Sequence, residues 1–302
     1  MRRSVFSDLP GVWLKGNVHS HTTRSDGHLS PQQVVDAYRD HDYDWLVLTD
    51  HNRFTDPAEL EAGGLVLLNG IELTTGWGPR IHANAFWAAG PAPYAADTPV
   101  SLADGEATVA ELRRLREAGC YLTLNHPHWS LLEPGMAEEA LFDALEAYNH
   151  STALYDNMGL GTIYWDQMLR RGFRLNATAG DDNHNGAPPD SIGCDSFGGF
   201  TMVKAGARTA EAVLEALRRG DFYASAGPII RDFFIEDGQV TLQCSPCTRL
   251  WICVDGRHYK SKTGRYLTRM QVPLPEGAHY LRAECLDAAG HSAYTNPLYM
   301  EV

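Results

Sequence analysis

Short apolar runs alternate with amphipathic stretches over the first 228 residues of the chain. The apolar runs predict strands at Leu14 to His21, Trp45 to Thr49, Leu65 to Leu68, Ile71 to Leu73, Ile81 to Trp87, Tyr121 to Leu124, Leu145 to Tyr148 and Phe173 to Ala179. The amphipathic stretches predict helices that begin after Ser30 and span Val109 to Ala118, Leu160 to Arg171 and Thr209 to Arg219. Strands that alternate with helices favour parallel βα units.

Polar side chains follow several of these predicted strands. His19 and His21 end the first strand two residues apart, and residues at this spacing point to the same side of a strand. Asp182 and His184 have the same spacing after the strand that ends at Ala179. Because (β/α) barrels build their sites at such strand ends, we expect a barrel that holds a multinuclear metal site.

Further candidate ligands lie at the ends of the intervening strands. They are Asp26, which a turn at Gly27 brings back beside the histidines, and His51, Glu72, His82 and His126. A carboxylate such as Glu72 can bridge two ions with its two oxygens, although a lone acid at a strand end is usually only exposed to solvent. His82 fits a hydrogen-bonded core histidine nearly as well as a ligand. Asp50 and Asp181 are expected to orient neighbouring groups or to cap turns.

The pattern changes near Gly227-Pro228. From there to Val302 the chain shows β-type runs separated by turns, among them Asp237-Gly238 and Asp255-Gly256, which are hairpin signals. We therefore predict two domains, a barrel over residues 1–228 and a small antiparallel, sandwich-like β domain over residues 229–302.

Composition narrows the classes of function. The formal charge is −13, and no basic face of the kind that nucleic-acid binders carry is visible among 25 Lys and Arg residues. No apolar stretch is long enough to span a membrane, and the first residues make a poor signal peptide, so we expect a cytoplasmic protein. An acidic chain can still bind an anionic substrate, because bound cations supply local positive charge.

The chain has 6 cysteines, and disulfides are not expected in a cytoplasmic protein. Cys244 and Cys247 have the spacing of a zinc-binding pair, which Cys253 and Cys285 would complete, but these last two are far apart in the sequence. Buried reduced thiols are the favoured interpretation.

The ordered set of motifs resembles the polymerase and histidinol phosphatase (PHP) superfamily of metal-dependent phosphoesterases. The motifs are His19-Ser20-His21 with Asp26-Gly27, Thr49-Asp50-His51, Gly70-Ile71-Glu72, His126-Pro127 and Gly180-Asp181-Asp182-Asn183-His184. The resemblance covers about residues 12–228. It departs from the family pattern at Asp181, where a serine is usual. The passage Tyr223 to Pro228 and the β tail resemble the metallohydrolase branch of the family, some members of which cleave esters other than phosphates.

The resemblance implies a distorted (β/α)7 barrel with two or three divalent ions, either Mn, Zn or Fe. It implies one ion on His19, His21, Glu72 and Asp182, a second on Glu72, His82 and His126, and a third on Asp26, His51 and His184. The implied reaction is hydrolysis of a small phosphate mono- or diester by a metal-bridged hydroxide. We expect His128 to act as the proton donor to the leaving group and to contact substrate, and Arg24 and Arg53 to bind the phosphate, Arg24 with a catalytic role.

Other interpretations stay open at this stage. The same metal centre could cleave carboxylic or carbamate esters, or the site could be structural within a non-catalytic binding module. The amidohydrolase barrel also begins with a His-x-His pair, but it often bridges its metals with a carbamylated lysine, and no lysine here follows a middle strand. Substrate identity and homo-oligomerisation are not fixed by the sequence.

Overall fold

The computed structural model describes residues 2–75, 80–88 and 92–300. Its helices are α1 (Pro31–Asp40), α2 (Gly105–Glu117), α3 (His150–Asp156), α4 (Thr162–Arg170) and α5 (Ala210–Arg219). Its strands are β1 (Arg3–Ser4), β2 (Val12–Asn17), β3 (Trp45–Val47), β4 (Val66–Leu73), β5 (Ala83–Trp87), β6 (Tyr121–Leu124), β7 (Ala144–Asn149), β8 (Asn176–Gly180), β9 (Phe200–Ala205), β10 (Phe222–Ser225), β11 (Ile230–Glu236), β12 (Gln239–Val254), β13 (Arg257–Pro273), β14 (Tyr280–Leu286), β15 (Ser292–Thr295) and β16 (Leu298–Tyr299).

The helix signals in the sequence mark real helix ends. Ser30 caps α1 in a complete capping box with Gln33, and Pro31 occupies the first turn. Helix α2 begins four residues before the predicted start, because Asp104 caps it by accepting a hydrogen bond from the backbone of Ala107. Helix α3 was not predicted; it follows β7 directly.

The sheet is mixed rather than purely parallel. Pairs β2–β3, β3–β4, β6–β7 and β7–β8 are parallel, as expected, whereas β5 is antiparallel to both β4 and β6, and β9 is antiparallel to β2. The predicted break at Gly70 is also wrong, because β4 runs through it. A side chain at position 70 would lie 2.2 Å from Val47, so glycine permits the close packing of β3 and β4.

Fourteen strands follow one path, β1-β11-β12-β14-β15-β10-β9-β2-β3-β4-β5-β6-β7-β8, while β13 pairs with β12 and β16 pairs with β14 off this path. Within the described residues no strand pair joins β8 back to β2, so a closed (β/α)7 barrel is not confirmed and the fold is a mixed α/β architecture. The segments after β2 and β8 nevertheless meet: the backbone N–H of Asp182 donates to His19 at 3.0 Å, and that of His21 donates to Asn183 at 3.0 Å. These bonds set two predicted ligand segments side by side.

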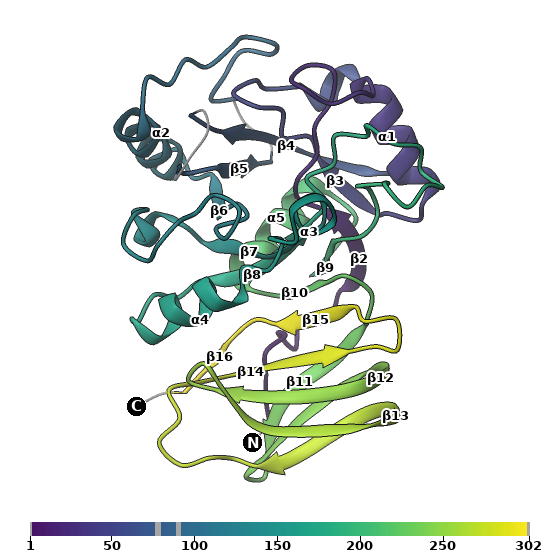
Figure 1. Ribbon diagram of the computed structural model, residues 1–302, viewed down its shortest axis with the longest axis vertical. Coiled ribbons are helices and arrows are strands. Elements are labelled where there is room, and N and C mark those ends of the chain that lie inside the picture. Colours follow the sequence, from purple (N-terminus) through teal and green to yellow (C-terminus); the bar gives the residue numbers. More distant parts are fainter. Residues whose placement is uncertain (1, 76–79, 89–91, 301–302) are drawn as a thin grey trace.

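The C-terminal strands gather at one end of the molecule, away from α1, α2 and the strands between them (Figure 1). Both predicted hairpin turns form, with Asp237, Gly238, Asp255 and Gly256 all at positive φ. The tail packs an apolar cluster of its own, which Phe6 and Tyr223 join from earlier in the sequence. Strand β1 pairs with β11, so residues 3–4 belong to the tail sheet; the division into two domains stays a prediction. No helix in the described part of the chain is long and apolar enough to cross a membrane.

Candidate metal centre

The structure brings the nine predicted ligand residues into one cluster. His19, His21 and Asp26 follow β2, His51 follows β3, Glu72 lies in β4, His82 precedes β5, His126 follows β6, and Asp182 and His184 follow β8. Groups of them place their ligand atoms within 4.8 Å of one another: His19, His21 and Glu72; His19, His126 and Asp182; Glu72, His82 and His126; and His21, Asp26, His51 and His184.

Glu72 lies at the centre of this cluster and is fully buried. Its Oε2 faces His19 and His21, each at 3.4 Å, and Nδ1 of His51 at 2.7 Å. Its Oε1 faces His82 at 3.2 Å and His126 at 3.7 Å. The two oxygens of one carboxylate therefore face two different groups of histidines, which is the arrangement a bridging ligand needs.

Asp182 completes the inner part of the cluster. Its Oδ1 lies 3.2 Å from Nε2 of His19 and 3.0 Å from Nε2 of His21, and its Oδ2 lies 3.6 Å from Nε2 of His126. Two ligands that each lie about 2 Å from one tetrahedral ion are themselves roughly 3.4 Å apart. Most of the contacts in this cluster are close to that separation.

Asp26, His51 and His184 form the outer, solvent-facing part. Asp26 lies 3.5 Å from Nε2 of His51 and 3.4 Å from Nε2 of His184. Asp182 contacts His19, His21 and His126, whereas His184 contacts Asp26, although strand alternation predicts that the two side chains point the same way. The backbone of Asp182 is left-handed, with φ at +55°, so the chain has left the strand geometry before His184.

Three buried polar atoms in the cluster make no hydrogen bond of normal geometry: Nε2 of His19, Nδ1 of His51 and Oε2 of Glu72, the last two of which meet only as an ion pair at 2.7 Å. Buried polar atoms are nearly always hydrogen-bonded in folded proteins, so atoms without partners need an explanation. The two histidine nitrogens both lie near Oε2 of Glu72. Imidazole nitrogens and carboxylate oxygens are the ligands that zinc, iron and manganese take. The residues present therefore fit divalent metal ions.

Sequence reasoning missed Glu146, which is fully buried in β7. Nδ1 of His19 donates to its Oε1 at 2.9 Å, and the backbone N–H of His126 and the side chain of Asn149 donate to its Oε2 at 2.9 and 2.8 Å. The bond to His19 fixes the ring so that Nε2 faces Glu72 and Asp182. Such a carboxylate behind a metal-binding histidine orients it and raises its basicity. The one signal in the sequence was an acid inside an apolar strand.

Other polar residues hold the ligand loops. Asp50 accepts hydrogen bonds from Thr22, Ser25 and Thr55 and so fixes the loop after His21. Asp181 accepts from Tyr38 and from the backbone of residues 197 and 199, and burial raises its pKa to about 6. Both acids therefore have the organising role expected of them.

The acids and histidines of the cluster shift one another's pKa values strongly. Burial alone would lower the pKa of His19, but Asp182, Glu146 and Glu72 together raise it well above its ordinary value. Burial and the positive charges of His51 and His184 lower the pKa of His21 to about 4. Perturbation of this kind is concentrated at functional sites.

A cavity of about 360 Å³ opens onto the cluster and is lined by Asp26, His51, Thr74, His82, His126, Trp129, Ser151, Thr152, Asp156, Asp182 and His184. His128 is exposed and lines a different cavity together with Tyr164 and Gln167, so the structure does not bring it to the cluster. The predicted proton-donor role of His128 has no support from this geometry.

Arg24 and Arg53 also lie outside the lining of this cavity. Both bind Asp97, with Nη1 of Arg53 at 2.8 Å and Nη1 of Arg24 at 3.4 Å from Oδ1, and Arg24 also binds Glu59 at 2.9 Å. Their predicted contact with substrate would require at least part of this ion-pair cluster to open.

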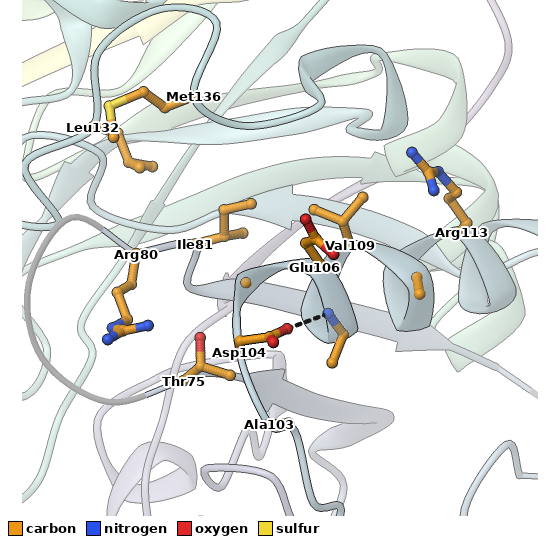
Figure 2. A pocket seen from close by; sticks show the side chains of 13 residues that line it. Thr75, Arg80, Ile81, Ala103, Asp104, Glu106, Val109, Arg113, Leu132 and Met136 are labelled. Atoms are coloured by element: carbon orange, nitrogen blue, oxygen red, sulfur yellow. Dashed lines mark hydrogen bonds between the residues drawn. The ribbon is translucent and has the colours of Figure 1, made fainter.

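The structure also has a larger cavity, of about 1080 Å³, whose lining residues are shown in Figure 2. Thr75 and Ile81 line it, and they adjoin Thr74 and His82, which line the smaller cavity. The first turn of α2 forms another wall, where Asp104 caps the helix.

Comparison with known proteins supports the fold. A solved two-domain protein from Bacteroides vulgatus, which contains a predicted PHP-like metal-dependent phosphoesterase, superposes with a TM-score of 0.56 at 19% identity over 97% of each chain. A solved amidohydrolase from Chromobacterium violaceum matches 56% of this chain and 87% of its own, with 19% identity and a TM-score of 0.41.

No family model matches the sequence. A 5'-3' exoribonuclease from Haemophilus influenzae is 38% identical over 73 residues, which are 22% of this chain and 27% of that protein, so the match spans about a quarter of the curated relative. The Bacteroides structure matches this chain over 97% of its length, and the protein shares the fold of that structure.

Proposed function

We propose that the chain is a metal-dependent hydrolase of the PHP superfamily that cleaves a small phosphate mono- or diester. The observation that carries this proposal is the convergence on Glu72 of five histidines from four segments of the chain, with three buried ligand atoms that make no hydrogen bond. A merely structural metal site would be closed, whereas this cluster opens onto a cavity.

The contacts support the assignment of ligands. His19, His21, Glu72 and Asp182 would hold one ion, and Glu72, His82 and His126 a second. Asp26, His51 and His184 would hold a third. The identity of the ions, Mn, Zn or Fe, is part of this proposal and follows only from the chemistry of the donors.

Divalent ions bound there would supply Lewis acidity, which activates water near neutral pH and neutralises charge on phosphoryl oxygens. Neighbouring side chains orient the histidine rings that would donate to these ions. Glu146 holds His19, and Ser130 lies 3.0 Å from Nδ1 of His126, so that the opposite nitrogen of each ring faces the cluster. Within the described part of the chain, no basic side chain lines the cavity apart from its histidines.

The relative from Haemophilus influenzae is named as an exoribonuclease, and a phosphodiester is therefore one substrate to test. The charge of −13 argues against a long nucleic acid and favours a small ester. The alternative, a carboxylic or carbamate ester, uses the same centre and differs in the charge of the substrate.

The test is a hydrolysis panel with bis-p-nitrophenyl phosphate, mononucleotides and naphthyl esters. Chelation should abolish the activity, and Mn²⁺ or Zn²⁺ should restore it. His19→Ala should reduce turnover by several orders of magnitude, whereas His279→Ala, an exposed histidine beside Asp255 in the tail, should leave it unchanged. Near-normal turnover in His19→Ala would refute the proposal, and activity on the naphthyl esters alone would establish the alternative.

A further inference from the structure

Three cysteines in the tail form a cluster that the proposed hydrolase centre does not use. Sulfur atoms of Cys244, Cys247 and Cys285 all lie within 4.8 Å of one another, and the three residues are 0–1% exposed. Cys244 and Cys247 belong to β12, and Cys285 belongs to the neighbouring strand β14. No disulfide joins them in the structure.

The backbone of β12 is irregular where it places this pair. Residues three apart in a regular strand point to opposite faces of the sheet, so Cys244 and Cys247 should not face the same side. The pairing of β12 with β13 shifts register between Gln243 and Cys247, and again between Cys247 and Arg249. Pro246, which lies between the two cysteines, is typical of such irregular positions. The irregularity turns both thiols inward, next to Cys285.

Cys253 provides a contrast within the same strand. It is equally buried, but its sulfur lies 3.8 Å from a carboxylate oxygen of Glu284 and takes no part in the cluster. Burial of cysteine in this sheet therefore does not by itself bring thiols together. The four-cysteine set suggested by the sequence is wrong in this respect, and three cysteines remain.

We propose that Cys244, Cys247 and Cys285 bind one thiophilic divalent cation of the zinc class, as a structural site that ties β12 to β14. Formation of three metal–sulfur bonds would release the three thiol protons to solvent. A non-cysteine donor, a water molecule or a backbone carbonyl, would complete the tetrahedron. Because the sulfur atoms are buried, the ion would enter as the tail folds. This proposal does not depend on the hydrolase proposal.

Cobalt is the probe that separates the two metal centres. Thiolate ligands give Co²⁺ a charge-transfer absorption in the near ultraviolet, and histidine and carboxylate ligands do not. The full chain would be produced in metal-depleted medium with added Co²⁺, purified in a reducing buffer, and examined by absorption and by metal analysis.

The expected result is a thiolate–cobalt band with one equivalent of cobalt assigned to it. The band should persist in His19→Ala/Asp182→Asn, which alters the other centre, and in the control Cys253→Ser. It should be lost in Cys247→Ser and in Cys285→Ser. If both of these variants fail to fold, wild-type protein decides the question: a strong chelator should raise the number of cysteines that react with a thiol reagent by three, while Cys120 and Cys253 stay protected by burial.

Three outcomes would overturn the proposal. They are a cobalt-loaded wild-type protein without the thiolate band, a band that survives both cysteine substitutions, and a Cys244–Cys247 disulfide in the purified protein.

Discussion

Nδ1 of His19 donates a hydrogen bond to Glu146 at 2.9 Å, and both side chains are completely buried. Loss of a carboxylate behind a metal-binding histidine typically costs ~10–100-fold in metal affinity or activity. We therefore expect Glu146→Gln to reduce metal affinity by about that factor, measured by titration of activity with a metal buffer. Glu139→Gln is the control, since Glu139 is also a buried acid but bonds Gly135 and Tyr164 instead. Equal metal affinity in the two variants would show that Glu146 has no such role.

Glu72 faces His19, His21 and His51 with one oxygen and His82 and His126 with the other. If it bridges, Glu72→Gln should remove more than one equivalent of metal and lower turnover by orders of magnitude. Metal analysis after gel filtration measures this directly. His184→Ala serves as the comparison, because His184 contacts the outer acid Asp26 and should lose one equivalent. Full metal content in Glu72→Gln would contradict the bridging role.

Asp97 binds both Arg24 and Arg53. If these arginines bind the phosphate, Asp97→Asn should release Arg53, leave Arg24 held by Glu59 alone, and lower KM for a phosphate ester. Exposed ion pairs are worth ~0.2–1 kcal/mol, so the expected change is up to about fivefold. KM for a neutral naphthyl ester should not change. A KM that falls equally for both esters, or for neither, would exclude a phosphate-binding role for the pair.

Arg282 of β14 is 1% exposed and binds Asp166 of α4 through two hydrogen bonds, at 2.9 and 2.7 Å. Removal of one partner of a buried ion pair costs ~3–5 kcal/mol, because the other charge is left buried and unpaired. Arg282→Met should therefore lower the free energy of unfolding by about this amount, as measured by urea denaturation. Arg269→Met, at an exposed position on β13, should change it by less than about 0.5 kcal/mol. Similar losses of unfolding free energy in the two variants would show that the Arg282–Asp166 ion pair does not stabilise the fold.

Glu284, which lies in the same strand as Arg282, is expected to make the free energy of unfolding depend on pH. Burial would raise its pKa, but His258 and Arg282 outweigh burial and lower it to about 2, from an ordinary value of 4.5. A depressed folded-state pKa means that the charged form stabilises the fold above about pH 4.5, and that this contribution is lost as pH falls toward 2. We expect Glu284→Gln to flatten the fall in unfolding free energy across that window. If the unfolding free energy falls equally steeply with pH in the variant, Glu284 is not the cause of the fall.

Much of the candidate metal centre follows from the sequence, because its proposed ligands lie near the ends of apolar strands. His19 and His21 face a common partner, Asp182, as their spacing predicts. The rule fails where the backbone turns into the left-handed region after a strand. Strand β6 ends at Leu124 and the backbone of His126 has φ at +23°, so spacing no longer indicates where His128 points.

Other features depend on contacts that sequence patterns do not record. Glu146 could be placed in a strand, but not on the face that meets His19, since that depends on which strands become neighbours. The antiparallel direction of β5 has the same origin. The three-cysteine cluster depends on a local shift of register in β12, which no periodicity predicts.

The pairing of β1 with β11 has a consequence for how the molecule assembles. Arg3 pairs with Ile235, and Ser4 pairs with Phe234, across some 230 intervening positions. During synthesis, residues 3–4 must remain without their β partner until β11 has emerged from the ribosome. Contacts between such distant positions slow folding, because a long loop must close before the contact contributes any stability. We therefore expect docking of this short strand to be among the last events of folding, after the strands around Glu72 have found one another.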